Sequence, residues 1–335
     1  MLQIDFYESG IGETIVITFP SGGIGIIDAH PSAEKTRSDI TEIVAGKKIH
    51  FVCLTHPHSD HGEDLPKILA TAKPDFFWHT VDDFTRLISC LEGGSVSFQT
   101  NYKDFTQDMH KGWPQFMVKL FSTAGRNKIP HRTLKDNLVP FEIDGVSITA
   151  LSPDEEMKEK WIKAYQSRIE SGRIKALPSP NFLSAILSVQ YGGVVALLGG
   201  DALKVNWNKA IPNYLKRKLP KATVLKVPHH GARNAFEFSP KGHKANYLSL
   251  LRADQKPIAI LFAGDVDHPD KEVFARLNKA SDVYWFHNPE IQSPDPLALL
   301  QHSGFKPVSE RKPVYSSFTV KIAPSGEVEA SSVPI

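Results

Sequence analysis

Three histidines and an aspartate lie close together directly after a strand-like run at residues 49–54: His56, His58, Asp60 and His61. Alternate residues of an extended segment project to one side, so His56 and His58 can reach a single metal ion. The turn into the following helix brings Asp60 and His61 to a second position. The spacing therefore predicts a metal-binding loop at the end of a strand that serves two adjacent ions.

This loop resembles the HxHxDH element of the metallo-β-lactamase-fold hydrolases. Further segments are similar, in the same order, to motifs of the branch of that family that includes ComEC and phosphorylcholine esterase: residues 8–17, 25–28, 197–201, 225–231 and 257–269, together with Asn181 and Ser184. The resemblance extends from about residue 1 to the C-terminus, with a looser fit at about 92–140. It implies an α/β fold, an αββα sandwich of two mixed β-sheets with outer helices.

The remaining metal ligands are expected at other strand ends. Asp201 follows the apolar run at 197–200, and its carboxylate is suited to bridging two cations, which would otherwise repel each other. We expect His56, His58 and Asp201 to hold one ion, and the second ion to be held by Asp60, His61, Asp201 and His230.

The first of these two ion sites is short of donors. Many family members supply another histidine where this chain has Asp154, so Asp154, Asn181 or water completes the shell, or the first ion is held weakly. His131 is a further candidate.

Two more histidines have candidate roles. If the Pro-His-His-Gly segment is extended, His229 and His230 point opposite ways, so only one of them can easily be a ligand. The resemblance favours His230, which leaves His229 for contact with substrate, although the reverse stays open. His268 could protonate a leaving group or hold phosphate, or be an ordinary surface histidine. The expected catalytic groups are therefore Asp60, Asp201, His229 and His268.

Several polar residues are expected around these ligands. Asp28 is expected to accept hydrogen bonds from the histidine loop and to orient its rings. Lys226, Arg233 and Lys241 could balance the non-bridging oxygens of a phosphoryl group, or form a solvated rim.

The expected cofactors are two divalent metal ions, zinc or manganese, because imidazole with carboxylate suits both. Two such ions would make hydroxide available at neutral pH for hydrolysis. Because the resembling branch is associated with phosphodiester cleavage, the expected substrate is a phosphodiester such as DNA or a nucleotide, and a DNA nuclease is one form of this hypothesis. The alternatives are hydrolysis of a small phosphoester or another ester, and a non-catalytic, metal-stabilised interaction module in a multi-protein system.

Composition agrees with a folded enzyme. The chain has 335 residues, 41% of them hydrophobic, and no linker-like segment divides it, so we expect one domain spanning 1–335 with an insertion or lid at about 92–140. The net charge of +2 is too small to indicate nucleic-acid binding by itself. Two cysteines indicate reduced thiols, and no segment is apolar for long enough to span a membrane, so we expect a cytoplasmic protein.

The order of predicted elements places the candidate residues at strand ends. Residues 2–7, 14–19 and 25–28 read as a β-meander, and hairpins are predicted through Asp144-Gly145 and Gly192-Gly193. Helices are predicted at 63–72, 154–172 and 205–219, and strands at 222–227 and 258–262. Residues 92–137 contain several aromatics among polar residues and are predicted to be an irregular flap.

Overall fold

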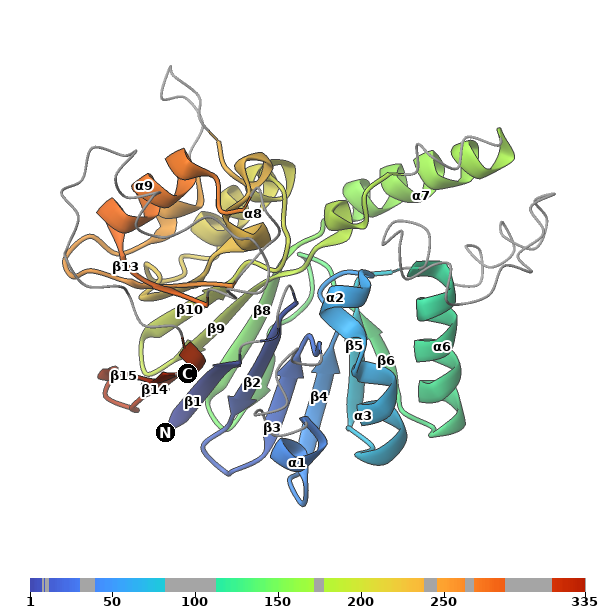
Figure 1. Cartoon of the computed structure of the whole chain (residues 1–335), viewed down its shortest axis with the longest axis horizontal. Helices are drawn as coiled ribbons and strands as arrows, with labels where there is room; N and C mark the ends of the chain where they lie inside the picture. Colours follow the sequence, from blue (N-terminus) through green and yellow to red (C-terminus); the bar gives the residue numbers. More distant parts are fainter. Residues whose placement is uncertain are drawn as a thin grey trace.

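Two β-sheets form the centre of the protein, as the computed structural model in Figure 1 shows. The model describes residues 1–7, 9, 12–30, 40–81, 113–171, 178–237, 246–262, 268–286 and 315–334. Within these residues, no helix is both long and apolar enough to cross a bilayer.

The first sheet has eight strands in the order β15-β14-β1-β2-β3-β4-β5-β6. Its strands are β1 (Leu2–Tyr7), β2 (Thr14–Thr18), β3 (Ile24–Ile27), β4 (Ile49–Cys53), β5 (Phe76–His79), β6 (His131–Thr133), β14 (Tyr315–Ile322) and β15 (Val328–Pro334). Strands β3 to β6 run parallel to one another, and the remaining pairs are antiparallel.

The second sheet has seven strands in the order β13-β12-β11-β10-β9-β8-β7. They are β7 (Phe141–Ile143), β8 (Val146–Ser152), β9 (Ile186–Tyr191), β10 (Val194–Leu198), β11 (Val224–Lys226), β12 (Ile258–Leu261) and β13 (Asp282–Trp285). Strands β10 to β13 are parallel, while β7 to β10 pair antiparallel. Each sheet therefore combines an antiparallel part with a parallel part, as predicted.

Three hydrophobic clusters bury both faces of the sheets. The cluster between the sheets joins residues of the first sheet, such as Phe51 and Trp78, to Leu187 and Ile260 of the second. The other two clusters lie on the outer faces, beneath helices. Buried strands covered on both sides need continuous apolar sequence, which explains runs such as residues 194–198.

The helices complete an αββα sandwich, which confirms the predicted fold class. On the first sheet lie α1 (Ile40–Val44), α3 (Leu65–Thr71) and α6 (Trp113–Arg126); on the second lie α8 (Lys204–Lys216) and α9 (Lys271–Ala280). The helix α7 (Glu155–Glu170) extends away from the sheets in Figure 1, and the short helix α2 (Ser59–Gly62) follows β4.

Both predicted hairpin turns are confirmed. Asp144 and Gly145 have φ values of 52° and 78°, and Gly192 and Gly193 have φ values of 55° and 77°. Two successive residues with positive φ are typical of the type I′ turn, whose twist matches that of the flanking strands.

The predicted irregular flap is wrong for its second half. Residues 113–133 include α6 and β6, and Phe116 and Leu120 of α6 are buried against the helices of the first sheet. Aromatic and aliphatic residues there repeat at helical spacing and form a packed face instead of a lid. Residues 92–112 lie outside the described residues, so the proposed insertion or lid stays a prediction.

Candidate metal centre

The candidate ligands gather where parallel strands of the two sheets end. Asp28 follows β3, His56 follows β4, Asp201 follows β10, and His229 follows β11. The carboxyl ends of parallel strands meet at one edge of a sheet, where α/β proteins commonly bind ligands. The two sheets are joined at this edge by the backbone N–H of Ala185, which donates to the carbonyl of Thr55 at 2.9 Å.

The histidine loop folds back on itself between β4 and α2. His56 Nε2 lies 3.0 Å from His58 Nδ1, and the rings of His56 and His61 have centroids 4.2 Å apart. Asp60 Oδ2 lies 3.9 Å from His61 Nε2. All four side chains are buried.

Asp28 orients this loop from behind. Its carboxylate accepts hydrogen bonds from the Thr55 backbone N–H at 2.8 Å, the Thr55 hydroxyl at 2.6 Å and His61 Nδ1 at 2.7 Å. Because Nδ1 of His61 donates to Asp28, its Nε2 is directed into the centre. This is the arrangement in which a carboxylate fixes the tautomer of a metal-binding histidine.

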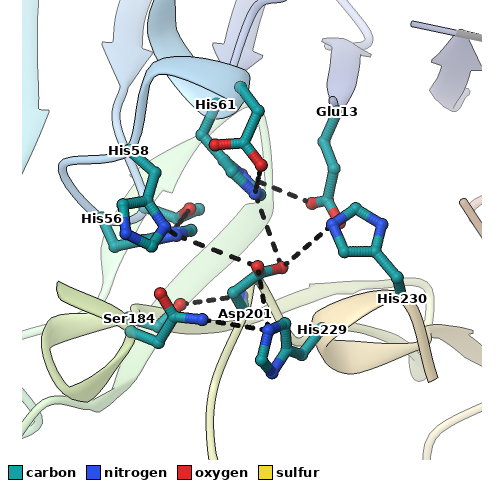
Figure 2. A network of polar contacts seen from close by, with 12 residues as sticks. Glu13, His56, His58, His61, Ser184, Asp201, His229 and His230 are labelled. Atoms are coloured by element: carbon teal, nitrogen blue, oxygen red, sulfur yellow. Dashed lines mark hydrogen bonds and ion pairs between the residues drawn. The ribbon is translucent and has the colours of Figure 1, made fainter. Parts of the chain in front are cut away.

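Asp201 stands in the middle of the histidines, with its backbone N–H donating to Ser184 Oγ at 2.8 Å (Figure 2). Its two carboxylate oxygens face different pairs of rings. Oδ1 lies 3.5 Å from His61 Nε2 and 3.8 Å from His230 Nε2. Oδ2 lies 3.9 Å from His56 Nε2 and 3.8 Å from His229 Nε2. A carboxylate with a pair of imidazoles beside each oxygen is arranged to bridge two cations.

The two adjacent histidines both face Asp201, so the premise of an extended Pro-His-His-Gly segment is wrong. His229 and His230 adopt left-handed backbone conformations, with φ values of 48° and 51°. This tight turn brings both rings to the same side. His229 Nδ1 donates to Asn234 Oδ1 at 2.9 Å, and its Nε2 accepts from Asn181 Nδ2 at 3.1 Å. Nε2 of His229 is therefore the nitrogen directed toward the centre.

The electrostatics of the centre favour neutral imidazoles on three of these histidines. Burial lowers the pKa of His56, of His229 and of His230, the last to about 4. Neutral imidazole is the form that binds metal. His61 differs: burial lowers its pKa, but the surrounding carboxylates, led by Asp201 and Asp28, outweigh burial and hold the pKa well above its usual value. Burial opposes ionisation of Asp201, but the neighbouring histidines hold its pKa well below the usual range.

One buried carboxylate was not singled out from the sequence. Glu13 is 1% exposed and lies beside His61, with its Oε2 3.8 Å from His61 Nδ1 (Figure 2). Its Oε1 forms an ion pair with Lys226, which is fully buried, donates to the carbonyl of Gly200 at 2.8 Å and lies 3.9 Å from Asp201 Oδ1. Glu13 lies within the family-like segment 8–17, just before the apolar strand β2, but no role was assigned to it there.

Some candidates lie elsewhere or have other partners. Asp154 accepts from the Met157 N–H at 2.7 Å and pairs with Lys209 at 3.1 Å, so it begins α7 and is not among the groups around Asp201. His131, the other candidate donor, has its Nδ1 3.2 Å from Nε2 of His79. Arg233 pairs with Asp270 and Glu272, each at 3.3 Å.

His268 lies at the edge of the centre, with its ring centroid 5.7 Å from that of His229. Lys241 lies outside the described residues.

The chemistry of the centre fits bound cations. Four carboxylates are buried there, and within the described residues Lys226 is the one lysine in contact with them: the acids are Glu13, Asp28, Asp60 and Asp201. Asp60 Oδ1, Asp201 Oδ1 and His230 Nδ1 are buried and have no hydrogen-bond partner within the described residues. Buried carboxylates are costly unless they are paired or coordinate metal.

No protein-family model matches the chain, and no curated protein matches it. It resembles the solved structure of Igni18, a metallo hydrolase from Ignicoccus hospitalis, with 12% identity, a TM-score of 0.42 and 98% of each chain covered. Zn²⁺-bound PqqB from Methylobacterium extorquens is 12% identical with a TM-score of 0.45, covering 85% of this chain and 98% of that chain.

A diphosphatase of the PhnP family is 11% identical with a TM-score of 0.33, covering 82% of this chain and 72% of that chain. Metallo-hydrolases are therefore among the solved structures that this chain resembles.

Proposed function

We propose that the protein is a metal-dependent hydrolase that cleaves phosphodiesters with two divalent metal ions bridged by Asp201. The observation that carries this proposal is the division of histidines between the two oxygens of Asp201. Such a pair of ions, when bound, supplies an activated water and neutralises the negative charge that develops on the phosphoryl oxygens.

The ion on the Oδ2 side is held by His56, His58 and Asp201. His229 supplies the donor that the sequence left open, because its Nε2 lies as close to Oδ2 of Asp201 as that of His56 does. Asn181 has a buried amide oxygen without a hydrogen-bond partner within the described residues. Rotation of this amide would place that oxygen beside His229 Nε2, where the amide nitrogen now lies.

The ion on the Oδ1 side is held by Asp60, His61, Asp201 and His230. His268 lies beside His229 at the edge of the centre, where it can hold a phosphoryl oxygen or protonate a leaving group. Lys226 pairs with Glu13 and lies near Asp201, and it does not reach substrate, because it is fully buried.

A small phosphodiester is favoured over a long polymer by the charges around the centre. Arg233, an exposed cation close to the two histidines in sequence, is neutralised by Asp270 and Glu272. Phe236, which could have stacked on a base, is buried against Tyr247. Cleavage of DNA would therefore require basic residues other than these. Comparing a small diester with DNA as substrates separates a small-molecule phosphodiesterase from a nuclease.

The test begins with protein stripped of metal by chelation. Hydrolysis of a chromogenic phosphodiester is measured after addition of Zn²⁺, Mn²⁺, Fe²⁺ or Mg²⁺, in parallel with cleavage of single-stranded DNA at rising salt. Turnover should return with at least one cation. Cleavage of DNA should fall steeply with salt if a polymer is bound electrostatically, whereas cleavage of the small diester should not.

Asp201→Asn should abolish turnover while the protein remains folded. A protein that stays inert with every cation would refute the proposal and leave the metal-stabilised interaction module as the alternative.

A further inference from the structure

Glu13 is an unexpected donor beside the expected ligands on the Oδ1 side of Asp201. One ligand atom from each of Glu13, His61, Asp201 and His230 lies within 4.8 Å of the others. Atoms that share a metal ion at bonds of about 2.0 to 2.2 Å lie at most about 4.4 Å apart, so only small side-chain movements separate this arrangement from coordination. All four side chains are buried.

The backbone is built to bring Glu13 to this place. The N–H of Glu13 donates to the carbonyl of Asp60 at 3.3 Å, which joins the start of β2 to the histidine loop. A side chain at Gly12 would not fit, because its Cβ would lie 2.3 Å from the same carbonyl of Asp60 and 2.4 Å from His30. Thr14, on the other side of Glu13, accepts from the His30 N–H at 3.1 Å. Glycine at position 12 therefore permits the close approach that puts the carboxylate beside His61.

We propose that Glu13 is a ligand of the ion on the Oδ1 side, which gives this ion two imidazoles and three carboxylates and favours Mn²⁺ or Fe²⁺ over Zn²⁺. This inference rests on the proposed function. The imidazoles are those of His61 and His230, and the carboxylates are those of Glu13, Asp60 and Asp201. Five protein donors with one water make six ligands. Carboxylate-rich, six-coordinate sites suit manganese and ferrous iron, whereas zinc prefers four ligands rich in nitrogen or sulfur.

The competing explanation is that Glu13 only neutralises Lys226. A buried ion pair needs no metal, and removal of one partner is strongly destabilising because the other charge stays buried. The contacts of Glu13 argue against this as its whole role. Besides its contact with Lys226, the Glu13 carboxylate has an oxygen within 4.8 Å of ligand atoms of His61, Asp201 and His230. Lys226 also lies 3.9 Å from Asp201 Oδ1, so its ammonium is shared between two carboxylates and is not dedicated to Glu13.

Three variants separate the two explanations: Glu13→Gln, Lys226→Met and the double variant Glu13→Gln/Lys226→Met. The double variant removes the ion pair without leaving a buried charge, so it keeps the test usable if Glu13→Gln alone does not fold. Bound metal per chain is measured by elemental analysis after dialysis against Mn²⁺ or Zn²⁺, and affinity by calorimetric titration.

Wild type and Lys226→Met should each bind two Mn²⁺ per chain. Glu13→Gln and the double variant should bind the second Mn²⁺ at least tenfold more weakly, with a smaller loss for Zn²⁺. Electron paramagnetic resonance supplies a readout independent of activity, because two adjacent Mn²⁺ ions are spin-coupled and a single one is not. Glu63→Gln is the matched control: it removes a carboxylate that contacts His30 from the surface, and metal binding should not change.

The double variant decides the question. Recovery of two tightly bound Mn²⁺ in that variant would overturn the inference, because Glu13 would then act only on Lys226. Equal weakening of Mn²⁺ and Zn²⁺ would overturn the proposed metal preference. Wild-type protein that binds no divalent ion would overturn both this inference and the proposed function, whereas two ions in wild type and in Glu13→Gln alike would overturn this inference alone.

Discussion

Gly200, next to Asp201, packs closely against Ser184, Ala185 and Thr55, and substitution of this glycine tests that packing. It has a φ of +48°, and a Cβ added there would lie 2.7 Å from Ser184 Oγ, 2.9 Å from the Ala185 carbonyl oxygen and 3.3 Å from Thr55 Cβ. Gly200→Ala should therefore cost about 1 to 2 kcal/mol for the left-handed backbone and about 1 to 3 kcal/mol for overpacking, or roughly 2 to 5 kcal/mol together.

Gly193→Ala is the matched control for Gly200→Ala. Gly193 has a φ of +77°, but a Cβ there meets nothing within 4 Å, so only the backbone cost of about 1 to 2 kcal/mol applies. The free energy of unfolding is measured by urea titration in the presence of a chelator, so that metal does not contribute. Equal losses in the two variants would refute the steric part of the reasoning.

The same substitution should affect metal binding. Ser184 Oγ accepts the hydrogen bond from the Asp201 N–H, and it is also the atom closest to the added methyl group at position 200. Displacement of Ser184 therefore displaces Asp201. We expect the thermal shift produced by saturating metal to be smaller for Gly200→Ala than for Gly193→Ala. A full-size shift in Gly200→Ala would show that Asp201 keeps its place without this hydrogen bond.

Three further substitutions test other parts of the structure. Burial lowers the pKa of His79 to about 3, so the stability it contributes is complete above pH 6.5 and is lost as the pH falls toward 3. In urea titrations between pH 4 and 6.5, His79→Gln should reduce the slope of the unfolding free energy against pH by up to about 1.4 kcal/mol per pH unit. An unchanged slope would contradict this assignment. Thr55→Val removes the hydroxyl that donates to the Asp28 carboxylate and should lower the free energy of unfolding by about 1.5 to 3 kcal/mol in the same assay. Thr80→Val removes a hydroxyl that donates to the Thr55 carbonyl at 3.3 Å and should cost about 0.5 to 1.5 kcal/mol. Similar losses in the two variants would mean that the charge on Asp28 does not strengthen its hydrogen bond. Asp270→Ala removes the N-cap of α9 and should lower stability by about 1 kcal/mol, whereas Asp270→Asn, which keeps a capping oxygen, should stay near wild type.

Individual elements were predictable because their signals are local, whereas their assembly into an αββα sandwich was predicted from the family resemblance. Strand-like runs ended at turn residues whose identity fixes the turn type, such as Asp144-Gly145, and helices followed with amphipathic spacing. The C-terminal hairpin β14–β15 was not predicted. It pairs with β1 across more than three hundred residues, and nothing local specifies such a partner.

The centre was predictable where several donors lie in one segment. His56, His58, Asp60 and His61 converge because the loop that holds them is short, and Asp201 joins them because it stands at a strand end. The orientation of His229 was not predictable in the same way. It depends on a left-handed turn at two non-glycine residues, His229 and His230. This conformation costs energy, and no residue type in the segment predicts it.

The ion pair between Glu13 and Lys226 was not predicted, for a different reason. Lys226 was expected to face a phosphoryl group or solvent, but it is fully buried, and Glu13, which directly precedes β2, was assigned no role. Their burial becomes understandable only when the two sheets are packed together, because β2 belongs to the first sheet and β11 to the second. An ion pair of this kind is a property of the packed sandwich, which a single segment of sequence does not contain.

The contacts around Asp201 therefore link metal binding to the packing of the two sheets. His56, His61 and Glu13 lie in segments next to strands of the first sheet, whereas Asp201 and His230 follow strands of the second. An ion held by donors from both sheets can form its full set of bonds only when the sheets are packed. Metal should then stabilise the folded chain by an amount set by its concentration relative to its dissociation constant, about 2.7 kcal/mol at a hundredfold excess. Without metal, the same carboxylates repel one another across the sheet interface, so the centre both depends on the sandwich and contributes to its stability.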